Sequence, residues 1–141
     1  MAFINMNQAY YMVAVRIEDQ EEPLFFYNKH SEEIERADEI CDKLHMDIKD
    51  FIPSDYDYIP LCFIKEHIIL RKYIESTNDK KIQSAFNNVE DKQLFAEFHR
   101  FFHSSPQYSF LLNDYSKFCY NFCKNLLINW CQENGLQYKN G

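Results

Sequence analysis

Residues 114–135, DYSKFCYNFCKNLLINWCQENG, contain the clearest structural signal in the chain. Apolar side chains recur there at intervals of three and four residues, which places them on one face of an α-helix. Asp114 is a suitable N-cap, because its carboxylate can accept a hydrogen bond from a free backbone N–H. Gly135 is typical of a helix C-terminus. The segment predicts a long helix with these inward side chains: Phe118, Cys119, Phe122, Leu126, Leu127, Trp130 and Cys131.

Three further segments upstream have helical spacing. Residues 90–103 place four large apolar side chains on one stripe. Residues 61–75 carry apolar side chains on more than one face, which is typical of a central, largely buried helix. Asp79 is a suitable N-cap for a shorter helix that contains Ile82 and Phe86.

Another helix is expected to begin after Ser31. Ser31 can cap it, and Glu32 and Glu33 would lie in its first turn, where carboxylates interact favourably with the helix dipole. The next apolar residues recur at helical spacing: Ile34, Ala37, Cys41, Leu44 and Ile48. Acidic residues occupy the other faces: Glu32, Glu35, Asp38, Glu39 and Asp42. The pattern predicts an amphipathic helix with an acidic exposed side.

Residues 10–17, YYMVAVRI, have two interpretations. The alternation and the β-branched residues favour a strand, and the aromatic run at residues 24–27 would pair with it as a hairpin. The alternative is a helix with the following residues on one face: Met6, Tyr10, Val13 and Ile17. The sequence leaves both open.

The composition favours one packed, mainly helical domain. The chain has 141 residues, of which 46% are hydrophobic and 17% aromatic, so a sizeable core can form. It has only two glycines, both near the C-terminal end, which disfavours folds built on tight glycine turns. We predict a single domain over residues 1–141, mainly α, a compact bundle of four or five helices with or without a short N-terminal β-hairpin.

The chain is expected to be cytoplasmic. No segment approaches the roughly 20 apolar residues that span a bilayer, so no membrane is expected as a partner. Residues 1–7 lack the pattern of a signal peptide. The five cysteines are odd in number and lie mostly in apolar helical patterns, which favours reduced thiols over a disulfide framework.

The charge is uneven along the chain, whose formal net charge is −7. Residues 18–57 hold fourteen acidic and four basic side chains, whereas residues 58–141 hold eight acidic and ten basic ones. A phosphate backbone is bound by clustered positive charge, so direct binding to nucleic acid is not expected. A basic protein is the expected partner, because complementary fields steer and select encounters.

The predicted partner-binding residues lie in two segments. The proline-bounded loop at residues 52–60 alternates acids with tyrosines, and tyrosine is frequent in interface hot spots. The acidic side of the helix expected after Ser31 would extend the same surface. The set is Glu32, Glu35, Glu39, Asp42, Asp55, Tyr56, Asp57 and Tyr58. The simpler alternative is an ordinary solvated surface whose tyrosines pack back on the domain.

A zinc-binding site is the alternative to a protein-binding function. His99 and His103 are four residues apart, as are Cys119 and Cys123, so two antiparallel helices could present four ligands. The closely spaced cysteines of a zinc knuckle are absent, however, and cysteines packed as small hydrophobes are the simpler interpretation. Glycine-rich phosphate loops and a His-Glu-x-x-His motif are also absent. We therefore predict neither a cofactor nor enzymatic activity.

The size, charge and composition of the whole chain resemble those of a known class of proteins. A small, acidic, aromatic-rich and glycine-poor chain without a catalytic motif resembles the immunity proteins of bacterial toxin–immunity systems, such as contact-dependent growth inhibition. The resemblance implies binding to a toxin domain, often a basic nuclease, and masking of its active site. These proteins share no family-wide motif, so no residue role is carried over. Phage-encoded inhibitors such as anti-CRISPR proteins have much the same character.

Overall fold

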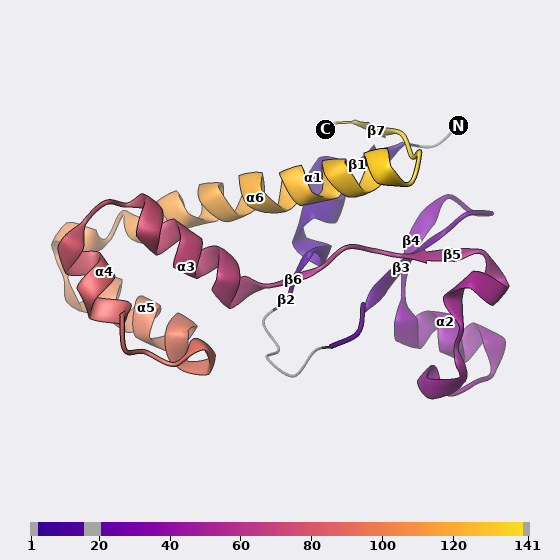
Figure 1. Ribbon diagram of the computed structural model, residues 1–141, viewed down its shortest axis with the longest axis horizontal. Helices are drawn as coiled ribbons and strands as arrows, with labels where there is room; N and C mark the ends of the chain where they lie inside the picture. The colour runs from indigo at the N-terminus through magenta and orange to yellow at the C-terminus, as the bar shows by residue number, and fades with distance from the viewer. Residues whose placement is uncertain (1–2, 16–20, 140–141) are drawn as a thin grey trace.

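The chain folds into a helical lobe and a smaller lobe built on a three-stranded sheet (Figure 1). The computed structural model describes residues 3–15 and 21–139. The α-helices in these residues are α1 (Met6–Ala9), α2 (Ala37–Leu44), α3 (Glu66–Ser76), α4 (Lys80–Phe86), α5 (Leu94–Ser104) and α6 (Leu111–Glu133). The mainly α prediction is confirmed. A bundle of four or five helices is not confirmed, because part of the chain forms small sheets.

The strands are short and belong to three sheets. They are β1 (Ile4–Asn5), β2 (Ala14–Val15), β3 (Phe25–Asn28), β4 (Glu33–Arg36), β5 (Tyr58–Pro60), β6 (Ile64–Lys65) and β7 (Tyr138–Lys139). Strand β3 lies between β4 and β5, antiparallel to both, whereas β1–β7 and β2–β6 are parallel pairs. Single turns of 3-10 helix connect the elements: η1 (Tyr10–Met12), η2 (Ile48–Asp50), η3 (Pro53–Tyr56), η4 (Asp91–Gln93) and η5 (Pro106–Tyr108).

Helix α6 runs along the top of the view in Figure 1, from the helical lobe toward the smaller lobe. It begins three residues before the predicted cap Asp114, whose carboxylate instead accepts a hydrogen bond from the Tyr73 hydroxyl (2.7 Å). Gly135 follows the helix with φ of 66°, so the predicted stop is confirmed. The predicted cap of α4 is also confirmed, since the Asp79 carboxylate accepts hydrogen bonds from the backbone of Lys81 and Ile82. The helix predicted over residues 90–103 is α5, preceded by η4.

The helix predicted after Ser31 is wrong over its first turns, because residues 33–36 form strand β4. Ser31 does not cap a helix; its backbone N–H donates to the side chain of Asn28 (3.1 Å). Pairing with β3 satisfies the backbone of these residues, and this tertiary pairing overrides their helical preference. The helix that does form, α2, begins at Ala37.

The N-terminal hairpin is also wrong. The alternative helical interpretation is closer for Met6–Met12, which form α1 and η1. Strand β2 pairs in parallel with β6 rather than with the aromatic run, and this distant pairing also delays the start of α3 from the predicted Leu61 to Glu66. Arg16 and Ile17, which the hairpin would have included, lie outside the described residues.

Strand β3 separates two hydrophobic clusters. Adjacent strand residues point to opposite faces, so Tyr27 packs into the large cluster of the helical lobe while Phe26 packs into a small cluster. The buried members of the small cluster are Phe26, Ala37, Ile40, Cys41, Phe51 and Tyr58. The smaller lobe therefore has a core of its own, under one face of its sheet.

Trp130 on α6 joins the two lobes. Its indole N–H donates to the backbone carbonyl of Pro60 at the end of β5 (2.9 Å), and its ring meets that of Tyr27 edge-on with centroids 6.3 Å apart. Trp130 is the only tryptophan in the chain. The hydrogen bond and the ring contact together hold the three-stranded sheet against α6.

We expect Trp130→Phe to lower the free energy of unfolding by about 1–3 kcal/mol, because the part-buried hydrogen bond to the Pro60 carbonyl is lost together with some of the buried ring surface. Urea unfolding followed by circular dichroism measures the change. Hydrogen exchange should accelerate at Tyr27 and Ile59 more than in α5. The control is Phe110→Leu, an exposed position where a change within about 0.5 kcal/mol is expected. Equal stability of the Trp130 variant and wild type would contradict this role.

Candidate functional site

The acidic residues of the first part of the chain gather on the smaller lobe. We call residues 21–60 the acidic lobe, since they hold twelve acidic and four basic side chains, a formal net charge of −8. The exposed acids are Glu21, Glu22, Glu33, Asp38, Glu39, Asp42, Asp47, Asp50, Asp55 and Asp57. Most of them come from β4, α2 and the loops around the small core, so negative charge is concentrated on the smaller lobe.

Ion pairs among the described residues involve some of these acids. Within the acidic lobe, Asp38 pairs with Arg36 (2.7 Å) and Glu35 with Lys43, and the His30 ring lies within hydrogen-bond distance of Asp57 (2.7 Å). Lys65 reaches across to Glu21 (3.4 Å). Cations of the helical lobe such as Arg71 and Arg100 instead pair with acids of their own lobe, Asp91 and Glu97. These two cations therefore pair within the helical lobe rather than with the acidic lobe.

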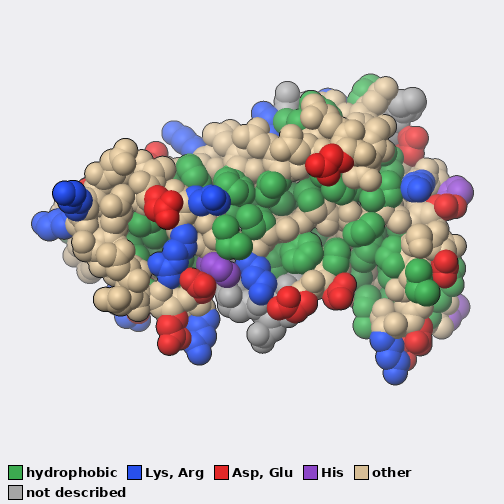
Figure 2. Space-filling model, in the orientation of Figure 1, with side chains coloured by type: hydrophobic (Ala, Val, Ile, Leu, Met, Phe, Trp, Pro, Cys, Tyr) green, Lys and Arg blue, Asp and Glu red, His purple; other side chains and the backbone are tan. Residues whose placement is uncertain are grey.

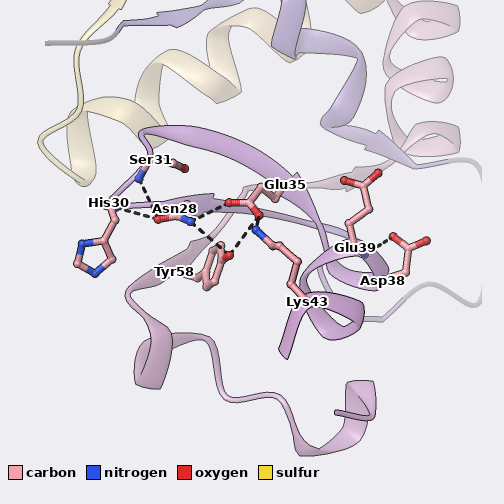
Figure 3. Close-up of polar contacts among 8 residues, drawn as sticks. All are labelled: Asn28, His30, Ser31, Glu35, Asp38, Glu39, Lys43 and Tyr58. Atoms are coloured by element: carbon pink, nitrogen blue, oxygen red, sulfur yellow. Dashed lines mark hydrogen bonds and ion pairs between the residues drawn. The ribbon is translucent and has the colours of Figure 1, made fainter. Parts of the chain in front are cut away.

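One carboxylate of the acidic lobe is structural. Glu35 on β4 has a side chain only 13% exposed and forms an ion pair with Lys43 of α2 (Figure 3). The Asn28 side-chain amide donates to Glu35 Oε2 (2.8 Å), and the Tyr58 hydroxyl donates to Oε1 (3.2 Å). Asn28 also accepts hydrogen bonds from the backbone of the following turn, at His30 (2.8 Å). The cluster ties the three strands to α2.

The protonation of Glu35 follows from these contacts. Burial by itself raises the pKa of this carboxyl, but hydrogen bonds from Lys43 and Asn28 and the charge of Lys43 outweigh burial and hold the pKa below its ordinary value. Burial and the neighbouring Glu35 charge raise the pKa of Tyr58. Glu35 is therefore a charged acceptor, and Tyr58 a neutral donor, at neutral pH.

We expect Glu35→Gln to lower the free energy of unfolding by about 1–3 kcal/mol at neutral pH, because it removes charge-assisted hydrogen bonds. A carboxyl with a lowered folded pKa stabilises the fold above its unfolded pKa of about 4.3, and this contribution is lost as the pH falls through the folded value. The difference between variant and wild type should therefore shrink below about pH 4. Urea titrations at several pH values measure it.

The control for this experiment is Glu39→Gln on the same lobe, where the side chain is exposed on α2. Its unfolding free energy should stay within about 0.5 kcal/mol of wild type. A pH-independent loss in the Glu35 variant would mean that shape rather than charge is responsible.

The structure divides the predicted partner-binding residues into two groups. Glu35 and Tyr58 are held inside the cluster, and Tyr58 is only 7% exposed. Glu32 is half-buried in the turn before β4, with φ of 59°. The exposed members are Glu39, Asp42, Asp55, Tyr56 and Asp57. These five remain the predicted binding residues that a partner could reach.

A groove on the acidic lobe was not predicted. It has a volume of about 450 Å³ and is lined mainly by apolar residues, including Leu24, Phe26 and Phe51. Ile48 (60% exposed) lines it, and Ile52 (56% exposed) follows the lining residue Phe51 in the chain. The signal in the sequence is DIKDFI at residues 47–52, in which acids and large apolar side chains are interleaved. Helical spacing had instead assigned Ile48 to a buried face.

Apolar side chains also gather on one face of the molecule. In Figure 2 they form a band below α6 that continues toward the acidic lobe, with both acidic and basic side chains at its margins. None of the helices in the described part of the chain is long and apolar enough to cross a membrane.

The structure does not bring the four predicted zinc ligands to one point. His99 stacks on His103 with ring centroids 6.2 Å apart, and His99 shares with Cys119 a cavity of about 190 Å³ that the buried Glu66 also lines. Cys123 lies on the buried side of α6. Over residues 3–15 and 21–139, no group of three or more His, Cys, Asp or Glu side chains is placed to hold a metal ion.

Burial keeps several of the cysteines as protonated thiols. None of the five cysteines, all of which lie in the described residues, forms a disulfide bond. Burial raises the pKa of Cys62 and of Cys131 to about 11 each. An interaction with the Cys119 thiol, together with burial, raises the pKa of Cys123. A reactive cysteine needs the opposite shift, so these three thiols are poor nucleophiles.

We expect Cys62 and Cys131 to react with iodoacetamide at pH 8 roughly 100-fold or more slowly in the native protein than in urea, because a pKa near 11 leaves little thiolate. Peptide mass spectrometry after timed labelling measures each rate. Rapid labelling of either thiol in the native state would show that it is more accessible than the fold indicates.

Comparison with protein-family models, curated proteins and solved structures found no match to this chain. Function must therefore be inferred from the chain's own residues.

Proposed function

We propose that this chain is a non-catalytic binding protein that docks through its acidic lobe onto a basic protein and inhibits it by covering its functional surface. The observation that carries the proposal is the gathering of ten exposed carboxylates on a lobe of residues 21–60 with a net charge of −8. Such a field speeds the encounter with a cationic partner and repels acidic ones.

The arrangement of the lobe supports binding. Exposed acids alone mostly support solubility, and exposed ion pairs contribute little affinity. Here the exposed apolar side chains Ile48, Ile52 and Tyr56 alternate along the chain with exposed acids, and a partner can bury them. An apolar centre with a charged rim is the usual composition of a specific interface.

The biological setting that fits this chemistry is a toxin–immunity pair. A nuclease toxin carries a basic surface that binds the phosphate backbone, and an acidic protein that occupies this surface blocks access of the substrate. The immunity protein would then act in the cell that makes it, as a stoichiometric inhibitor without an active site of its own.

The test compares two variants that each remove three negative charges. The lobe variant carries Glu39→Gln, Asp42→Asn and Asp55→Asn, all at exposed positions. The control variant carries Glu75→Gln, Glu90→Gln and Glu97→Gln, all on the helical lobe. Wild type and both variants are immobilised in parallel, and proteins captured from native lysate are eluted by a salt gradient and quantified.

The expected result is a set of basic proteins that wild type and the control variant retain and the lobe variant loses. Three exposed pairs of about 0.2–1 kcal/mol each predict an affinity loss of roughly 3- to 100-fold, greater at low salt. A captured enzyme should lose its activity on adding one equivalent of wild type. Partners that are acidic, or that bind the lobe variant as well as wild type, would exclude this function.

A further inference from the structure

The groove on the acidic lobe is large enough to receive a large apolar side chain. Its volume of about 450 Å³ falls within the range of roughly 300–1,000 Å³ that is typical of ligand pockets. The rings of Phe26 and Phe51 meet edge-on with centroids 5.3 Å apart, and both residues belong to the small core. The groove therefore has a fixed apolar floor.

The walls of the groove are rigid. Three prolines line it, Pro23, Pro53 and Pro60, and each has a fixed φ and no backbone N–H. A wall without free N–H donors can cover an apolar group without leaving a donor unsatisfied. A preformed pocket also binds with a smaller loss of conformational entropy.

The rim of the groove carries negative charge. Glu22 lines it, and the exposed acids Asp47 and Asp50 flank Ile48 and Lys49 in the chain. Lys49 is the only basic residue among the described lining residues. An apolar floor with an acidic rim is complementary to an apolar side chain that is flanked by lysine or arginine.

We propose that this groove seats one large apolar side chain, phenylalanine or leucine, from a basic segment of the protein partner. This inference rests on the proposed function and adds the chemistry of the partner's anchor residue. Buried aromatic and aliphatic anchors supply much of the affinity of an interface, while the surrounding charges select the partner.

The charge also argues against other occupants. A symmetric pair of this chain would place two acidic lobes, each with a net charge of −8, against one another. An anionic membrane or a nucleic acid would meet the same repulsion. A cationic protein segment is the occupant whose charge favours the contact.

The probes for the test are three capped pentapeptides. Lys-Lys-Phe-Lys-Lys carries the proposed anchor and charges, Lys-Lys-Ala-Lys-Lys lacks the anchor, and Glu-Glu-Phe-Glu-Glu reverses the charges. Each is titrated at low salt into the ¹⁵N-labelled full chain. Backbone amide shifts at Leu24, Lys49 and Phe51, which line the groove, report occupancy.

The phenylalanine peptide with lysines should shift these amides and bind roughly 10- to 100-fold more tightly than the alanine peptide, as expected for burial of one large apolar side chain. The acidic peptide should not bind. Ile48→Ser should weaken binding of the first peptide, whereas Ile68→Ser on α3, also at an exposed isoleucine, should not. The amide spectrum of each variant verifies folding.

The outcomes separate this inference from the proposed function. Equal binding of the alanine and phenylalanine peptides, or shifts that avoid the groove, would overturn the anchor site while leaving charge-driven docking intact. Equal binding of the acidic peptide would remove the electrostatic basis of the proposed function. If no peptide shifts the groove amides at millimolar concentration, the anchor site is absent. A dimer in sedimentation velocity that Ile48→Ser dissociates would assign the groove to a second copy of the chain.

Discussion

Strand β3 is buried on both faces and paired along both edges, and the arrangement of the molecule depends on this constraint. Its residues must be apolar on two sides, because Phe26 faces the small core and Tyr27 the large one. The acidic lobe is thereby attached to the helical lobe through apolar contact and the Trp130–Pro60 hydrogen bond. Its charges are therefore not needed for attachment and remain on the outside.

The concentration of charge has a cost within the lobe. Like charges repel in the compact state, and a small core offers limited apolar burial in return. The Glu35–Lys43 pair lies where β4 and α2 meet and offsets part of this repulsion, because a partly buried pair is less screened than an exposed one. Structural and exposed acids thus have separate tasks in the same lobe: Glu35 holds the elements together, and residues such as Glu39 and Asp55 contribute the external field.

The sequence predicted the helical lobe better than the acidic lobe, for physical reasons. The α4 cap at Asp79 and the α6 stop at Gly135 depend on local hydrogen bonding, so local patterns identify them. A strand buried on both faces lacks the alternation that reveals strands, and the parallel β2–β6 pair joins distant segments. The clustering of acids in space followed from their clustering in sequence. No local pattern distinguishes Glu35 from its exposed neighbours, since its burial arises only when three strands and α2 meet.

The turns of the acidic lobe suit a surface that binds without rearranging. Three residues other than glycine adopt positive φ there, Glu32, His45 and Asp57, a conformation that costs an L-residue roughly 1–2 kcal/mol. Glycine would relieve this strain, but it would also give the unfolded chain more conformations to lose on folding. Together with the prolines that line the groove, these turns hold the exposed acids and the apolar floor in one geometry. A preorganised surface of this kind favours a binding role, because the partner need not supply free energy to order it.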